Sequence, residues 1–171
     1  MRKLMILGAL CAVPCPSVDA RSAEDGETDR WEKAILAFEE QDRLHTPPQG
    51  GILFVGSSTI RLWDLEKYFP GLPTLNRGFG GSQTSDVLRY VSRIVIPYRP
   101  RIIVLYEGDN DIAAGKSPDQ VWRDLRSLLA RIRSALPGTQ VVFLSIKPSQ
   151  ARWKLYGQMN EVNRRVRQAA V

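Results

Sequence analysis

Ile52-Leu-Phe-Val-Gly-Ser-Ser-Thr59 is the stretch that decides the fold of this 171-residue chain. Its first four residues, Ile52 to Val55, form a continuous apolar run. Such a run is typical of a short strand that is buried on both faces, as in a parallel sheet. The Gly-Ser-Ser that follows predicts a turn into a helix, since serine is favoured at the residue that caps a helix. A strand that leads directly into a helix is the repeating unit of α/β proteins.

The same unit recurs to the end of the chain. Further strands are predicted at 74–76, 101–106 and 141–146, and helices over 57–69, from 84, from 117 and over the last residues. The three later helices each carry one apolar face at helical spacing. These faces are formed by Val87, Tyr90, Val91 and Ile94, by Val121, Leu125, Leu128 and Ile132, and by Leu155, Met159, Val162 and Val166. The alternation predicts one α/β domain, with a parallel sheet and helices on both of its faces.

The N-terminus has the features of a secretory signal peptide. Arg2 and Lys3 precede an apolar run at 4–13 that is too short to span a bilayer. Val18-Asp-Ala20 presents small residues at the two positions that a signal peptidase reads. We therefore expect cleavage after Ala20 and a secreted or periplasmic protein, with an uncleaved anchor as the alternative.

Three segments follow from this division of the chain. The signal peptide is expected at 1–20, and residues 21–50 are expected to hold a linker, at 23–29, and an N-terminal helix. The α/β domain then covers residues 51–171. Neither a repeat nor a second domain is apparent in the sequence, which suits a single core for a chain of this length.

Composition indicates a globular protein and excludes several kinds of site. Hydrophobic residues make up 43% and charged residues 25% of the chain, which argues against disorder and against a protein built of membrane spans. Cys11 and Cys15 both lie within the predicted signal peptide, so a disulfide, a catalytic thiol and a cysteine metal site are excluded from the mature chain. The net charge of +6 comes with no nucleic-acid-binding motif, so no nucleic acid is predicted as a partner.

Residues able to carry chemistry gather in three loops. In an open α/β sheet, ligands bind beyond the carboxyl ends of the strands, which here selects the loops at 56–60, 77–83 and 107–114. In the first loop, Ser58 is expected at a helix N-terminus, where a backbone N–H favours a developing negative charge. The Gly-Ser-Ser of this loop is by itself equally typical of a turn and of a helix cap.

The other two loops leave more than one interpretation open. The glycines within 78–81 let a backbone N–H approach a ligand, but they also suit a tight turn or a phosphate-binding loop that lacks the lysine of a Walker motif. In the third loop, the amide of Asn110 can donate to a negatively charged oxygen, and an Asx turn is the plainer interpretation. Glu107, Asp109 and Asp111 also permit a carboxylate pair for acid–base chemistry or a divalent-metal site.

Taken together, the three loops resemble a known family. The resemblance is carried by Ile52-Leu-Phe-Val-Gly-Ser-Ser-Thr-Ile-Arg-Leu-Trp63, Asn76-Arg-Gly-Phe-Gly-Gly-Ser-Gln83 and Tyr106-Glu-Gly-Asp-Asn-Asp-Ile-Ala113. These segments are similar to the first three motif blocks of the SGNH/GDSL hydrolases, in the branch of the platelet-activating-factor acetylhydrolase subunits and bacterial GDSL-like lipases. The resemblance extends from Gly51 to the C-terminus. It implies a flavodoxin-like three-layer α/β/α sandwich, hydrolysis of carboxylic esters through an acyl-serine intermediate, and no cofactor.

The first motif block implies the nucleophile. The family's Gly-Asp-Ser falls on Gly56, Ser57 and Ser58, so the resemblance makes Ser58 the catalytic residue. Serine at position 57 replaces the aspartate of the family motif. This departure weakens the match of the first block but keeps the nucleophile.

The other two blocks imply an oxyanion hole. It would be formed by the backbone N–H groups of Ser58 and Gly81 and by the side-chain amide of Asn110. Gly108 and Asp111 complete the third block as supporting residues, together with Gly56 of the first. No metal ion is implied by the resemblance.

The base of the family mechanism is not found in these residues. In the family, a histidine oriented by an aspartate three residues earlier follows on a loop near the C-terminus. This sequence has one histidine, His45, which precedes the first predicted strand, and it has no Asp-x-x-His. We therefore expect a chain truncated before the last strand and helix of the fold, poorly stable and inactive or nearly so. A natural short form without the base, and His45 acting from an unusual direction, are the alternatives.

Three functions remain open at this point. A secreted esterase would act on a small-molecule ester, such as an acyl lipid or an acylated carbohydrate, without stable membrane insertion, and its oligomeric state is not predicted. A pseudoenzyme would bind an acyl or glycan ligand through Gly81 and Asn110 and leave it intact. A mononucleotide-binding protein would instead need phosphate or flavin contacts from the first loop.

Overall fold

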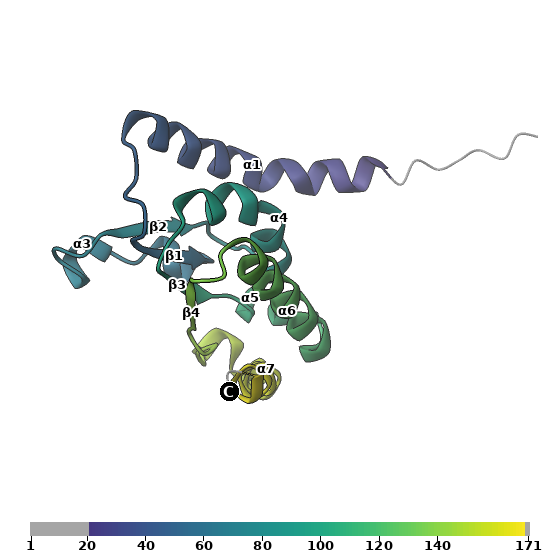
Figure 1. Cartoon of the computed structure of the whole chain (residues 1–171). Coiled ribbons are helices and arrows are strands. Elements are labelled where there is room, and N and C mark those ends of the chain that lie inside the picture. Colours follow the sequence, from purple (N-terminus) through teal and green to yellow (C-terminus); the bar gives the residue numbers. More distant parts are fainter. Residues whose placement is uncertain (1–20, 170–171) are drawn as a thin grey trace, which may run out of the picture.

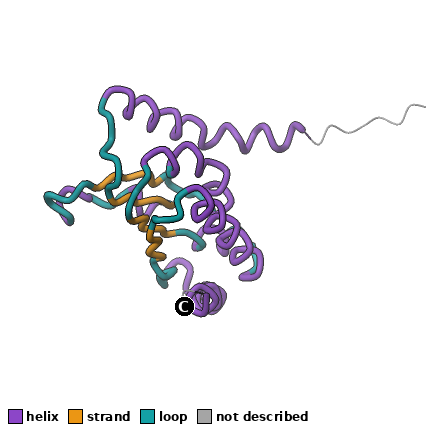
Figure 2. The backbone as a smooth tube through the Cα atoms, in the orientation of Figure 1, coloured by secondary structure: helices purple, strands orange, loops and turns teal. Residues whose placement is uncertain are grey.

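The computed structural model describes residues 21–169, and the predicted signal peptide at 1–20 lies outside them. In this part of the chain, four strands form one sheet in the order β2-β1-β3-β4 (Figures 1 and 2). The strands are β1 (Ile52–Gly56), β2 (Thr74–Gly78), β3 (Ile102–Tyr106) and β4 (Gln140–Phe143). Every pairing is parallel, so the predicted α/β architecture is confirmed.

Helices connect the strands, as the alternation in the sequence predicts. The longer helices are α1 (Arg21–Leu44), α4 (Thr84–Ile94), α6 (Pro118–Ala135) and α7 (Tyr156–Ala169). The shorter ones are α2 (Ser58–Arg61), α3 (Leu65–Tyr68), α5 (Asp109–Ala113) and the 3-10 turns η1 (Ile96–Tyr98) and η2 (Gln150–Leu155). The apolar faces predicted for α4 and α6 are buried at all of their positions. No helix in the described part of the chain combines the length and the apolar character needed to cross a membrane.

The sheet carries a layer of helices on each face. Leu53 and Val55 of β1 share one core cluster with the apolar faces of α4 and α6. Phe54 points to the opposite face and packs with Ile60 of α2 and Leu65 of α3. The apolar run of β1 is therefore buried on both sides, which is why it is continuous rather than alternating.

Helix α1 lies along α4 and is held there by two groups of charged side chains (Figure 1). Arg93 of α4 donates from Nε to Glu39 at 2.6 Å and from Nη1 to Glu32 at 2.7 Å. Arg77, at the end of β2, is buried and pairs with Asp42 of α1. These contacts fix the part of α1 from Glu32 to Asp42 to the α/β core.

Some boundaries differ from those that the sequence predicts. The stretch 57–69, predicted as one helix, forms α2 and α3, because Asp64 accepts a hydrogen bond of 3.1 Å from the N–H of Lys67 and begins a new helix. Residues 23–29, predicted as a linker, belong to α1, since most of their residue types tolerate a helix. The third loop contains the short helix α5 where the sequence allowed only a turn.

Candidate active site

Ser58 begins α2 just beyond the end of β1. Gly56, the last residue of the strand, has a φ of 142°, and a Cβ atom on it would lie 2.1 Å from the carbonyl oxygen of Tyr106. Glycine is therefore required where β1 passes β3. The carbonyl oxygen of the buried Ser57 accepts a hydrogen bond of 3.0 Å from the N–H of Ile60, which closes the turn and leaves Ser58 partly exposed.

Gly81 lies in the loop after β2, next to the first loop. The N–H of Phe79 donates to the carbonyl oxygen of Gly56 at 2.9 Å, which joins the two loops. A Cβ atom on Gly81 would lie 3.2 Å from Nη2 of Arg30 and 3.3 Å from Cη2 of Trp31. Helix α1 therefore packs against this glycine, and the ring of Trp31 meets that of Phe79 edge-on, with 5.5 Å between their centroids.

Asn110 is joined to the second loop by its side chain. It lies in α5, directly after β3, and its Nδ2 donates to the carbonyl oxygen of Ser82 at 2.9 Å. Its Oδ1 accepts a hydrogen bond of 2.9 Å from Nη2 of Arg152, whose Nη1 bonds to Asp109 at 3.0 Å. The amide thus lies between the residue that follows Gly81 and an arginine of η2.

Gly108 and Asp111 tie the third loop to its surroundings. A Cβ atom on Gly108 would lie 2.5 Å from Cδ1 of Ile146, so the loop passes close to the segment after β4. The buried Asp111 accepts hydrogen bonds of 3.0 Å from the N–H of Thr84 and from Nζ of Lys116. Its carboxylate lies at the N-terminus of α4, where the helix dipole favours a negative charge.

A buried carboxyl group lies among the loops. Glu107 is fully buried, and its Oε1 accepts a hydrogen bond of 2.5 Å from Oγ of Ser82. Burial raises the pKa of Glu107 well above its usual value, the bond from Ser82 opposes this effect, and the charge of Asp111 adds to it. The second oxygen, Oε2, has no hydrogen-bond partner among the described residues.

The carboxylates of the third loop do not converge on a metal site. Glu107 bonds to Ser82, whereas Asp109 and Asp111 bond to different partners on η2 and α4. Within the part of the chain that the structure describes, no group of three or more histidine, cysteine, aspartate or glutamate side chains is arranged to hold a metal ion.

His45 lies at the other end of the sheet. It is exposed in the segment between α1 and β1. Its backbone N–H donates to the carbonyl oxygen of Gln41 at 2.8 Å, which closes the last turn of α1. His45 precedes β1 and Ser58 follows it, and a five-residue strand is about 16 Å long. The structure therefore does not bring the one histidine of the sequence to the predicted nucleophile.

The three predicted loops contact one another, but two of their contacts could not be predicted from the sequence. The bond between Arg152 and Asn110 joins residues 42 positions apart, and the bond between Ser82 and Glu107 spans 25 positions. Neither contact has a local pattern in the sequence. Both become visible only when the fold places η2 and the second loop beside the end of β3.

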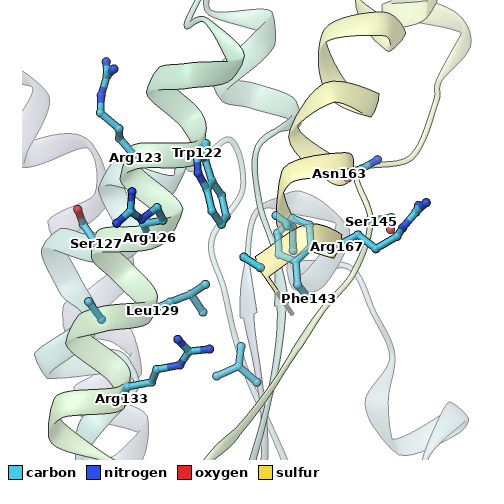
Figure 3. A pocket seen from close by; sticks show the side chains of 14 residues that line it. Trp122, Arg123, Arg126, Ser127, Leu129, Arg133, Phe143, Ser145, Asn163 and Arg167 are labelled. Atoms are coloured by element: carbon cyan, nitrogen blue, oxygen red, sulfur yellow. The ribbon is translucent and has the colours of Figure 1, made fainter. Parts of the chain in front are cut away.

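A cavity of about 780 Å³ lies away from these loops, between α6, β4 and α7 (Figure 3). Its apolar lining includes Trp122, Leu129 and Phe143, and none of the predicted site residues lines it. Four arginines also contribute to its wall: Arg123, Arg126, Arg133 and Arg167. The cavity belongs to the free edge of the sheet at β4 rather than to the loops around Ser58.

Comparisons with known proteins agree with this architecture. The model of the GDSL-like lipase/acylhydrolase family matches residues 62–171. A search of the curated proteins finds no match.

Solved structures of family members share the fold. A protein assigned as a platelet activating factor from Streptococcus pneumonia superposes with a TM-score of 0.71, at 20% identity, over 86% of this chain and 73% of that one. A protein assigned as an acylhydrolase, from Bacteroides fragilis, gives a TM-score of 0.66 at 17% identity, over 83% of this chain and 71% of that one. A variant of an acetyl xylan esterase from Geobacillus stearothermophilus gives a TM-score of 0.57 at 18% identity, over 72% of this chain and 73% of that one. Because the sequence identities are low, these superpositions establish a common fold and no more than that.

Proposed function

The chain belongs to the GDSL-like lipase/acylhydrolase family, and on that premise we propose that it hydrolyses carboxylic esters through an acyl intermediate on Ser58. The observation that carries the proposal is the bond of 2.9 Å between Nδ2 of Asn110 and the carbonyl oxygen of Ser82. It joins the third loop to the second, beside Gly81. The bond between Phe79 and Gly56 joins the second loop to the first, which supports one site shared by all three.

In the proposed acylation step, Oγ of Ser58 attacks the ester carbonyl carbon and its proton passes to a base. The negative charge that develops on the carbonyl oxygen is stabilised by the N–H groups of Ser58 and Gly81 and by Nδ2 of Asn110. Collapse of the tetrahedral intermediate breaks the bond to the leaving alcohol, which takes up a proton. Water then hydrolyses the acyl-serine in the same way and restores Ser58.

Transfer of the proton from Ser58 to a base is expected to limit the rate of ester hydrolysis by the 171-residue chain. A serine hydroxyl is a weak nucleophile without an adjacent base, and His45 lies at the opposite end of β1. An oxyanion hole alone still leaves about 10³-fold acceleration over water in serine hydrolases that have lost their triad. We therefore expect slow acylation by esters with good leaving groups, and still slower release of the acyl group.

Acylated carbohydrates and acyl lipids are the proposed substrates. A structural relative is described as an acetyl xylan esterase, which supports an acetylated carbohydrate. A secreted or periplasmic location, inferred from the predicted signal peptide, would give access to such polymers. The acyl group itself is proposed to be small, and acetyl esters are the first to test.

Intact-protein mass spectrometry after mixing with p-nitrophenyl acetate tests the proposal. We expect a burst of p-nitrophenol and one added acetyl group on the peptide that contains Ser58, and faster turnover when imidazole supplies a base. Ser58→Ala should abolish the adduct. Ser134→Ala, at an exposed position of α6, should keep it. An adduct that survives Ser58→Ala would exclude this serine as the nucleophile.

One observation favours a second function. Because no histidine approaches Ser58 in the described residues, a pseudoenzyme that binds an acylated carbohydrate without cleaving it fits the same loops. Such a protein would bind acetylated xylooligosaccharide in calorimetry, weakened by Asn110→Ala, and would form no acetyl adduct even with imidazole.

A further inference from the structure

Arg152 is the only residue of η2 that the structure bonds to both Asp109 and Asn110 of the third loop. Its Nη2 donates to Oδ1 of Asn110 at 2.9 Å, and its Nη1 donates to Oδ2 of Asp109 at 3.0 Å. We propose that Arg152 is a positioning residue, which fixes the orientation of the Asn110 amide and so completes the oxyanion hole. This inference rests on the proposed function.

The two ends of the Asn110 amide group differ in hydrogen bonding. The oxygen and the NH₂ of asparagine have nearly the same shape, so rotation by half a turn exchanges an acceptor for a donor. A guanidinium group can only donate hydrogen bonds. Arg152, together with the carbonyl oxygen of Ser82, therefore selects the orientation in which Oδ1 faces η2 and Nδ2 faces the second loop.

In that orientation, only one of the two N–H groups on Nδ2 of Asn110 is used within the described residues. One N–H of Nδ2 is used by the carbonyl oxygen of Ser82. The second N–H has no acceptor among the described residues, so it can donate to an oxygen that becomes negatively charged beside Gly81. Because a donor to Oδ1 polarises the whole amide, the bond from Arg152 also makes these N–H groups stronger donors.

Arg152 is itself held in place by its surroundings. Asp109 supplies the opposite charge, and the bonds from Nη1 to Asp109 and from Nη2 to Asn110 together restrict the orientation of the planar guanidinium group. The segment that carries Arg152 is anchored at its start, where the side chain of Asn163 in α7 bonds to the N–H and the carbonyl oxygen of Ile146 at 2.8 and 3.0 Å. The guanidinium thus reaches the third loop from a fixed support.

The rate constant of acetylation of Ser58 by p-nitrophenyl acetate tests the proposal. Arg152→Met is expected to lower the rate constant at saturating ester at least about 10-fold, since a lost oxyanion donor costs about 10² or more. The ester concentration at half-saturation should change little. Arg152→Lys should recover only part of the rate, because one ammonium group does not reproduce the planar fork. Arg131→Met, at an exposed position of α6, is the matched control and should acetylate at the wild-type rate.

A double-mutant cycle shows whether Arg152 acts through Asn110. Asn110→Ala combined with Arg152→Met should be no slower than Asn110→Ala alone. Multiplied effects, or an unchanged rate in Arg152→Met, would overturn the inference while leaving Ser58 as the nucleophile. Failure of the proposed function would look different, since Ser58→Ala and the wild type would then acetylate alike.

Nuclear magnetic resonance provides a readout that does not depend on activity. In ¹⁵N-labelled protein, the side-chain amide signals of Asn110 can be assigned by their loss in Asn110→Ala. They should shift and exchange with water faster in Arg152→Met, but not in Arg131→Met. Unchanged signals in a folded Arg152→Met protein would contradict a positioning role, whatever the rate of acetylation.

Discussion

Glu107 is the residue whose ionisation bears most directly on the three loops. Its carboxyl group is buried, bonded to Ser82 of the second loop and close to other carboxylates. A charge at this place has no cation among its bonded partners, so the protonated form suits the folded protein better than the charged form. The neutral carboxyl can hold the second and third loops together without a charge in the core.

Stability is expected to depend on pH through this group. The usual pKa of glutamate, 4.5, applies to the unfolded chain, and burial raises the pKa of Glu107 in the folded one. Above about pH 4.5 the unfolded chain loses this proton first, so the free energy of unfolding falls as pH rises, until the folded-state pKa is passed. Glu107→Gln keeps an acceptor for Ser82 and has no proton to lose. Urea unfolding at a series of pH values above about 4.5 should show the stability of this variant, relative to wild type, growing with pH until the folded-state pKa of Glu107 is passed.

The exposed Glu66 of α3 provides the comparison. Glu66→Gln removes a carboxylate of the same kind at the surface, without a buried partner. As a surface substitution, it should change the free energy of unfolding by less than about 0.5 kcal/mol. Parallel curves for Glu107→Gln and wild type would mean that Glu107 does not titrate differently in the folded protein.

At the scale of elements, α1 is an integral part of the α/β domain. Its Ile35 is fully buried in the same core cluster as β1, α4 and α6. The ion pairs of Arg93 and Arg77 add to this contact. The helix that the sequence predicts before the α/β domain thus contributes to the main core.

Truncation of one buried side chain of α1 measures that contribution. Ile35→Ala is expected to lower the free energy of unfolding of the whole domain by about 2–4 kcal/mol, because it leaves a cavity in the core cluster that α1 shares with β1, α4 and α6. Leu36→Ala is the matched control, since Leu36 is 52% exposed and should cost less than about 0.5 kcal/mol. A single unfolding transition that shifts only with Ile35→Ala is the expected result in urea. Loss of α1 alone, with the sheet still folded, would contradict it.

Elements with a strong local pattern were predictable, and those decided by one cap or one distant contact were not. The faces of α4 and α6 follow from their spacing, because a helix must bury one side. The loops that contain Ser58, Gly81 and Asn110 could be placed at one edge because parallel strands end at the same edge of a sheet. The break at Asp64 depends on a single hydrogen bond, and the contact of Arg152 depends on where η2 lies after folding.

At the scale of the whole molecule, the described sheet has a free edge at β4. This strand pairs only with β3, and its Val142 is 47% exposed. The cavity beside it is lined by apolar side chains and by arginines for which the structure shows no ion pair in the described residues. An exposed edge with apolar side chains favours pairing with another chain, whereas the arginines oppose it by charge repulsion.

Self-association through β4 is therefore expected to increase with salt, which screens the arginines. Val142→Lys should suppress it, because a charged residue on an edge strand disfavours strand pairing. Sedimentation velocity at several protein and salt concentrations would measure the effect. Leu44→Lys, at a 66% exposed position of α1, serves as the control and should associate like wild type. Equal association of wild type and Val142→Lys would exclude the β4 edge.

The order of the strands also determines when each part of the sheet can form while the chain is being synthesised. Strand β1 pairs with β2 on one side, where Ile52 faces Thr74, and with β3 on the other, where Ile52 faces Ile102. A nascent chain can close the first pairing well before the second, because contacts between distant residues form later and more slowly. Until Tyr106 has left the ribosome, β1 keeps one edge open, and this apolar strand is where a chaperone is expected to bind first.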